Sequence, residues 1–144
     1  MADEQKPKTK SFAARKDRVR LTLLVYRKPG MSLDEFHQYW KNQHAELFSS
    51  IAIVKKNLLS YVQMREACAH VNEEASAQLK QVGFPVSDAD GMAIFEAPSY
   101  AMIAACFQDE EYQKIVVPDE ENFLDRGRCF ALAAELVPVL DDAT

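Results

Sequence analysis

The stretch Met31–Leu47, MSLDEFHQYWKNQHAEL, decides how the first half of this chain is predicted to fold. Ser32 and Glu35 form an S-x-x-E capping box, which marks the start of a helix. The preceding segment Val19–Tyr26, VRLTLLVY, is β-branched and apolar and predicts a strand. The turn Lys28–Gly30 separates the two elements. The chain therefore opens with a strand, a tight turn and a well-marked helix.

One face of this helix carries a histidine among apolar side chains. Phe36, Trp40, His44 and Leu47 follow the three- and four-residue spacing of a single helical stripe. An imidazole in such surroundings can move protons near neutral pH. The same pattern also fits a core histidine that bonds a backbone carbonyl, so both interpretations remain open. His37, beside two acidic residues, is predicted to face solvent.

Beyond this stretch the sequence alternates strand and helix patterns. The first helical period continues to residue 56. The other predicted elements are strands at 58–65, 92–96 and 129–140, an inserted helix at 72–82, and a helix from 99 to 107. Residues 109–114 read as a charged turn that is helical in one interpretation, and 116–125 as extended or irregular. The order β-α-β-(insert)-β-α-β predicts an α+β fold with a ferredoxin-like β-α-β-β-α-β unit.

The predicted strands are apolar on both faces, but the two helices of this unit cover only one. LTLLV at 21–25 and CFALAAEL at 129–136 are examples. We therefore expect a second copy to cover the other face, giving a homodimer in which two sheets meet as a dimeric α+β barrel.

Length and charge limit the domain count and the partners. The chain has 144 residues and a net charge of −5, which suits one domain and argues against a nucleic-acid partner. Residues 1–17 are basic and lack apolar periodicity, so they are predicted to be a disordered tail. The domain is expected over 18–140, with a short C-terminal tail at 141–144. No segment reads as a signal peptide or membrane span, and we expect no membrane partner.

The three cysteines, Cys68, Cys106 and Cys129, are widely spaced and odd in number. This pattern argues against a disulfide framework and a zinc site, and it favours a reducing, cytoplasmic location. The histidines have no metal-ligand spacing, so no metal is predicted. The chain has four glycines and neither a phosphate-binding loop nor a dinucleotide fingerprint.

These motifs together resemble the EthD-domain proteins of the dimeric α+β barrel superfamily. That family has a Lys-Pro-Gly turn followed by a helix with F-x-x-Y/H-W-x-x-x-H-A-P-L. The matching residues here are Phe36, Tyr39, Trp40, His44, Ala45 and Leu47. Glu46 replaces the usual proline. Asp90-Gly91 before MAIFEA and the segment 107–125, FQDEEYQKIVVPDEENFLD, resemble the second half of the domain. The chain is especially similar to fungal polyketide-tailoring members of the atrochrysone carboxylic acid decarboxylase type.

The resemblance implies a cofactor-free lyase that decarboxylates a small aromatic polyketide carboxylic acid. A polyketide cyclase or dehydratase of the same fold, and a non-catalytic binding protein, are the alternatives. Predicted catalytic residues are His44 as acid or base, Asp90 as its orienting partner, and Tyr26 and Tyr61 as hydrogen-bond donors to an enolate or phenolate. The predicted substrate-binding residues are Trp40, Phe48, Phe95, Phe107, His70 and Phe123. For the tyrosines, Asp90 and His70, ordinary structural roles remain open; the acidic residues around Phe123 read as a solvated turn.

Overall fold

The protein is described by a computed structural model that covers residues 11–64 and 73–140. Its strands are β1 (Val19–Val25), β2 (Ser60–Met64), β3 (Gly91–Ala97) and β4 (Phe130–Glu135). They form one sheet in the order β2-β3-β1-β4, and every neighbouring pair is antiparallel. The predicted ferredoxin-like α+β fold is confirmed.

The first helical segment consists of four consecutive elements. These are α1 (Leu33–Tyr39), the π-helical turn η1 (Trp40–His44), α2 (Ala45–Ser50) and α3 (Ala52–Asn57). Ser32 Oγ accepts the Glu35 N–H at 3.1 Å, as the capping pattern predicts. In η1 the Ala45 N–H reaches back to Trp40 O, one residue further than in an α-helix.

The second half of the chain supplies α4 (Glu73–Gln81), α5 (Tyr100–Gln108) and α6 (Glu110–Glu120), followed by the 3-10 turn η2 (Arg126–Arg128). Gly83, with a φ of 90°, follows the end of α4 in a left-handed conformation. Helix α6 corrects the interpretation of residues 116–125 as irregular. Asp109 caps α6 by accepting the Tyr112 N–H at 3.2 Å, and the helix continues through Pro118.

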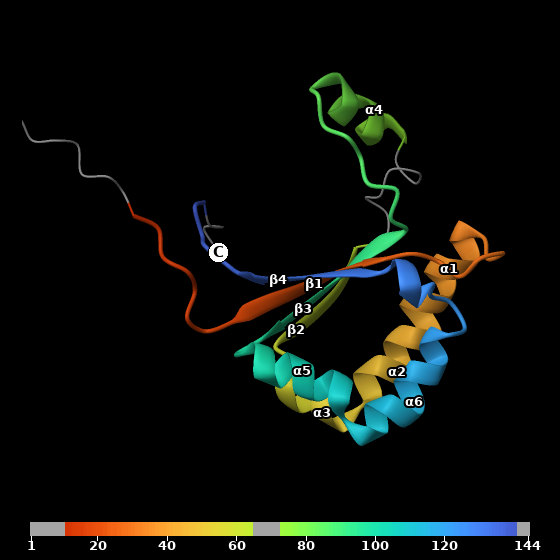
Figure 1. Cartoon of the computed structure of the whole chain (residues 1–144), viewed down its shortest axis with the longest axis vertical. Coiled ribbons are helices and arrows are strands. Elements are labelled where there is room, and N and C mark those ends of the chain that lie inside the picture. The colour runs from red at the N-terminus through yellow and green to blue at the C-terminus, as the bar shows by residue number, and fades with distance from the viewer. Residues whose placement is uncertain (1–10, 65–72, 141–144) are drawn as a thin grey trace, which may run out of the picture.

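The helices lie on one face of the sheet, and the other face is open. Figure 1 shows α1, α2, α3, α5 and α6 on one side, with α4 projecting from the opposite side on its own loop. The core lies between sheet and helices; its largest fully buried side chains include Trp40, Phe36, Phe48 and Phe123. The predicted stripe of Phe36, Trp40 and His44 is confirmed as buried.

Part of the predicted N-terminal tail lies against the residue that follows β4, the edge strand. The Arg15 backbone N–H donates to Leu136 O at 2.7 Å. The domain boundary at residue 17 stays a prediction. Among the described residues, no helix has both the length and the apolar character needed to cross a bilayer.

Candidate active site

His44 forms a buried pair with Asp119, which sequence reasoning had placed in a solvated turn. His44 is 5% exposed, and its Nδ1 lies 2.8 Å from Asp119 Oδ2. The other carboxylate oxygen of Asp119 accepts from the Tyr39 hydroxyl, which in turn accepts from the Asn122 side chain at 3.1 Å. Because a carboxylate only accepts, this contact fixes the proton of neutral His44 on Nδ1.

The surroundings of His44 favour its neutral form. Burial lowers the pKa of His44 below its ordinary value, while the hydrogen bond and charge of Asp119 and the charge of Glu120 partly offset that effect. No described residue bonds Nε2. Since no fully buried side-chain nitrogen or oxygen in the described residues lacks a partner, Nε2 must keep some exposed surface. His44 therefore has a basic nitrogen that has no partner among the described residues.

The prediction that Asp90 orients His44 is wrong, because Asp119 occupies that position. Asp90 follows the loop before β3, and its carboxylate accepts from the Arg27 backbone N–H at 2.7 Å and from Arg27 Nη1 at 3.0 Å. Its backbone carbonyl accepts from His37 Nε2 at 2.9 Å. His37 is therefore buried, against the prediction of a solvent-facing side chain.

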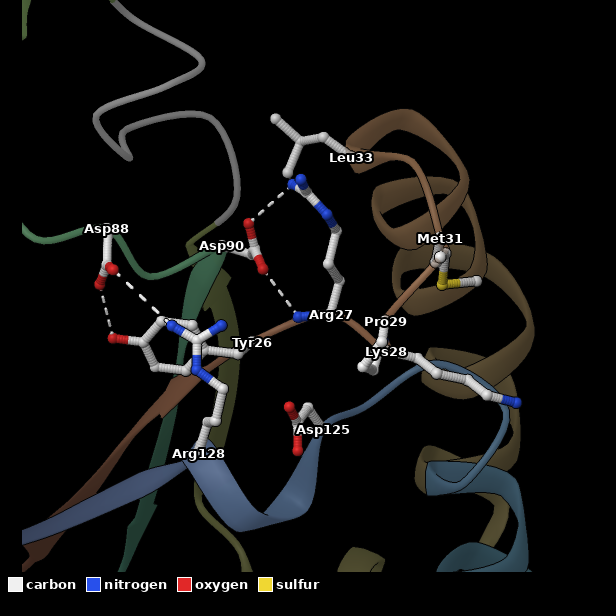
Figure 2. A pocket seen from close by; sticks show the side chains of 11 residues that line it. Tyr26, Arg27, Lys28, Pro29, Met31, Leu33, Asp88, Asp90, Asp125 and Arg128 are labelled. Atoms are coloured by element: carbon white, nitrogen blue, oxygen red, sulfur yellow. Dashed lines mark hydrogen bonds and ion pairs between the residues drawn. The ribbon is translucent and has the colours of Figure 1, made fainter.

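Tyr26 and Asp90 belong to a separate charged cleft at the end of β1. Figure 2 shows this cleft, which has a volume of about 570 Å³. The Tyr26 hydroxyl donates to Asp88 at 2.9 Å, and this bond raises the pKa of Tyr26. The Arg128 guanidinium lies 4.2 Å above the Tyr26 ring. The polar groups here are largely paired with one another, so the cleft is poorly suited to a flat apolar ligand. A catalytic role for Tyr26 or Asp90 stays a prediction.

The predicted aromatic residues do gather on the helix side of the sheet. Their rings form a connected series, with centroid separations of 5.7 Å for His44–Phe48, 4.7 Å for His44–Phe123, 4.6 Å for Phe48–Tyr61, 5.1 Å for Tyr61–Phe95 and 5.6 Å for Phe95–Phe107. Burial raises the pKa of Tyr61 to about 12, so this phenol stays protonated. Gln63 donates to its oxygen at 3.1 Å. Trp40 is part of the core against β3; His70 lies outside the described residues.

A groove between the sheet and α5–α6 has the form expected of a small-molecule site. Its volume is about 410 Å³. The lining side chains are Leu21, Leu23, Phe107, Tyr112, Gln113, Val117, Glu120, Leu124, Arg126, Cys129 and Ala131. Of the predicted substrate-binding residues, Phe107 lines it directly. Phe48 lies one layer behind, in contact with both His44 and Tyr112, at ring separations of 5.7 and 6.0 Å.

The polar side chains of this groove were missed by the sequence analysis. The Tyr112 hydroxyl donates to Glu120 Oε1 at 2.9 Å, and Arg126 Nε lies 3.3 Å from Glu120 Oε2. Burial and the nearby Glu120 charge raise the pKa of Tyr112. The spacing of 112, 116 and 120 was the available signal, because it places Tyr112 and Glu120 on one face of a helix.

Comparison with known proteins identifies the family. The EthD domain model matches residues 28–127. This chain belongs to the EthD domain family. It is also 32% identical over 115 residues to "Decarboxylase claH" of Passalora fulva, spanning 75% of this chain and 69% of that protein. The sequence-based recognition of an EthD-domain protein is therefore confirmed.

Solved structures agree on the fold. An ethyl tert-butyl ether d (EthD) family protein from Bacillus halodurans matches with a TM-score of 0.54 and 17% identity, covering 83% of this chain and 98% of that one. An EthD-like protein from Ralstonia eutropha matches with a TM-score of 0.53 and 12% identity, covering 90% and 98%. A dimeric ferredoxin-like protein of unknown function from Thermobifida fusca matches at 0.52 and 11%, covering 83% and 91%.

Proposed function

We propose that this EthD-domain protein is a cofactor-free decarboxylase that acts on an aromatic polyketide carboxylic acid. The observation that carries the proposal is the buried His44–Asp119 pair, which leaves Nε2 unbonded beside an aromatic enclosure. The apolar groove next to it supports a flat substrate. The likeness to a protein named a decarboxylase supports the reaction type.

Decarboxylation of such an acid needs a proton at carbon and a place for the electrons of the breaking bond. In a substrate with a hydroxyl group ortho to the carboxylate, neutral His44 takes the hydroxyl proton on Nε2. The imidazolium then returns that proton to the ring carbon that carries the carboxylate. The bond to the carboxylate breaks, carbon dioxide leaves, and the electron pair restores the aromatic ring as a phenolate, which takes a proton from water.

Asp119 would act by holding Nδ1–H and stabilising the imidazolium that forms between these two transfers. His44 does not line the groove itself, so the carboxyl-bearing end of the substrate must reach from the groove to Nε2. Glu120 lines the groove, and its negative charge also favours the imidazolium form of His44. The phenol of Tyr61 stays protonated in its buried position and would be the donor to the developing phenolate.

The direct test replaces His44 with alanine. A panel of ortho-hydroxy aromatic carboxylic acids is incubated with the full chain, and carbon dioxide and product are measured by mass spectrometry. We expect His44→Ala to lower kcat by about 10² to 10⁴-fold, with circular dichroism unchanged. Lys41→Ala, an exposed position in the same helical turn, is the matched control and should keep full activity.

Two outcomes contradict the proposal. Full activity in His44→Ala would remove His44 from the reaction. An acid that binds the wild-type protein tightly but is converted into a ring-closed or dehydrated product, or is not converted at all, would favour a cyclase, a dehydratase or a binding protein.

We further propose that the protein acts as a homodimer whose two open sheet faces meet. On that face Phe130 is 64% and Leu132 65% exposed, and Val62 and Met64 are also exposed. Such a continuous apolar surface is unusual for a monomer. A dimer that covers it would bury on the order of 2,000 Å² or more in total. The free thiols of Cys106 and Cys129 support a proposed cytoplasmic location.

A further inference from the structure

The charged side chains of the groove beside α6 lie together in one ion pair. Of its lining residues, only Glu120 and Arg126 are charged. Leu21, Leu23 and Phe107 make up much of its apolar wall. A ligand that fills this space is therefore mainly apolar, and any charge that it carries must be accommodated near these two side chains.

Glu120 forms an ion pair with Arg126, whose Nε lies 3.3 Å from Glu120 Oε2. The Glu120 side chain is 12% exposed, and both of its oxygens are used: one accepts from Tyr112 and the other contacts Arg126 Nε. The Arg126 side chain is 59% exposed, and its terminal nitrogens, Nη1 and Nη2, have no partner among the described residues. A guanidinium held through Nε can still offer these two nitrogens as a parallel pair of donors.

Building on the proposed function, we infer that Arg126 binds the carboxylate of the substrate through its terminal nitrogens, with Glu120 as the residue that positions it. The ligand class is a planar aromatic compound with a single carboxylate. A single guanidinium can bind one carboxylate through its terminal nitrogens, whereas a polyphosphate or a dicarboxylate would need further cations in the groove.

This assignment predicts which kinetic constant changes. A charge-assisted contact to the ground-state carboxylate tightens substrate binding, but it does not by itself stabilise a transition state in which that carboxylate is leaving. Arg126 should therefore affect KM more than kcat. It should also separate substrate from product, because the decarboxylated phenol has no group for Arg126 to bind.

The test measures binding by isothermal titration of the full chain carrying His44→Ala, so that turnover does not consume the acid during the titration. The probes are 3-hydroxy-2-naphthoic acid and 2-naphthol, which differ only by the carboxyl group. For Arg126→Met we expect the Kd of the acid to rise about 10- to 100-fold, while that of 2-naphthol stays within twofold. Arg126→Lys should recover part of the loss. Lys114→Met, which removes an exposed positive charge on α6 outside the groove, is the matched control and should change neither Kd.

Three outcomes overturn the inference. An unchanged Kd for the acid in Arg126→Met excludes Arg126 as its ligand. Equal weakening of both probes shows that Arg126 maintains the shape of the groove. If neither probe binds the protein that keeps Arg126, the groove is not an aromatic acid site. Because binding needs no turnover, Arg126-dependent binding without release of carbon dioxide would refute only the proposed decarboxylase activity.

Discussion

Replacing Asp119 with asparagine should switch the proton of His44 from one ring nitrogen to the other. Asp119 accepts from two donors, the Tyr39 hydroxyl and His44 Nδ1–H. Asparagine has one accepting oxygen and one donating NH₂ group, so it cannot accept from both. The Tyr39 hydroxyl already accepts from Asn122, which leaves its own proton to be donated. The asparagine oxygen should therefore stay with Tyr39, and its NH₂ group should face His44.

The change of tautomer in Asp119→Asn determines how far kcat and the folding free energy should fall. With an NH₂ group opposite Nδ1, neutral His44 is forced to carry its proton on Nε2 and loses the basic nitrogen that the proposed reaction needs. We expect kcat to fall about 10² to 10⁴-fold, the range of a lost general base. The lost bond to a charged acceptor is worth about 1.5–3 kcal/mol of folding free energy. The pKa of His44 should fall further, because Asp119 raises it in the wild-type protein.

The tautomer is read by long-range ¹H–¹⁵N correlation spectra of the imidazole, and the free energy of unfolding by urea titration. Tyr39→Phe is the matched control: it removes the other donor to the same carboxylate and should leave the His44 proton on Nδ1. An Asp119→Asn protein that keeps wild-type kcat, or keeps the Nδ1–H tautomer, would refute the assigned role of this pair.

Three further results are expected. Gly91→Ala would place a Cβ 2.6 Å from Trp40 Cζ3 and should lower the free energy of unfolding in urea by about 1–3 kcal/mol. Gly127→Ala is the control, because its Cβ would have no contact closer than 3.8 Å, and it should lower that free energy far less. Equal losses in the two variants would contradict the packing around Gly91. Leu132→Glu on the open sheet face should give a monomer by light scattering, whereas Ile115→Glu, an exposed position on α6, should not; a monomeric wild-type protein would exclude the dimer. The unfolding free energy should decrease as pH falls below about 6.5, because His44 binds a proton more readily in the unfolded chain than in the folded one, and His44→Asn should reduce this slope.

The local parts of the fold could be predicted from the sequence because each has a local cause. The Ser32 cap and the buried stripe through Trp40 each depend on residues within one or two helical turns. The segment after Asp109 was harder to interpret. Its proline and acidic residues favour a turn, but the Asp109 cap and the burial of Tyr112 and Val116 against the core stabilise a helix there.

The pairing of His44 with Asp119 had no comparable local signal. The two residues are 75 positions apart, and the helix that positions Asp119 was itself missed. The sequence analysis assigned Asp90 to this position instead. In the structure, His37, one turn before Trp40, forms a hydrogen bond with the Asp90 carbonyl. The Asp90 carboxylate accepts from Arg27. The same helix thus contacts two acidic residues through two histidines, and which histidine reaches which acid depends on its rotation.

That rotation is set by the wide turn at Trp40–His44. The Trp40 carbonyl accepts from the Ala45 N–H and also from Gln63 Nε2 at 2.8 Å, so β2 supports the turn from outside the helix. A π-type turn adds a residue to the helical repeat and shifts the side chains that follow it relative to those before it. His37 lies before this turn and faces β3, while His44 lies at its end and faces α6. A helical wheel drawn from the sequence cannot contain that shift, because the bond from Gln63 exists only after the sheet has formed.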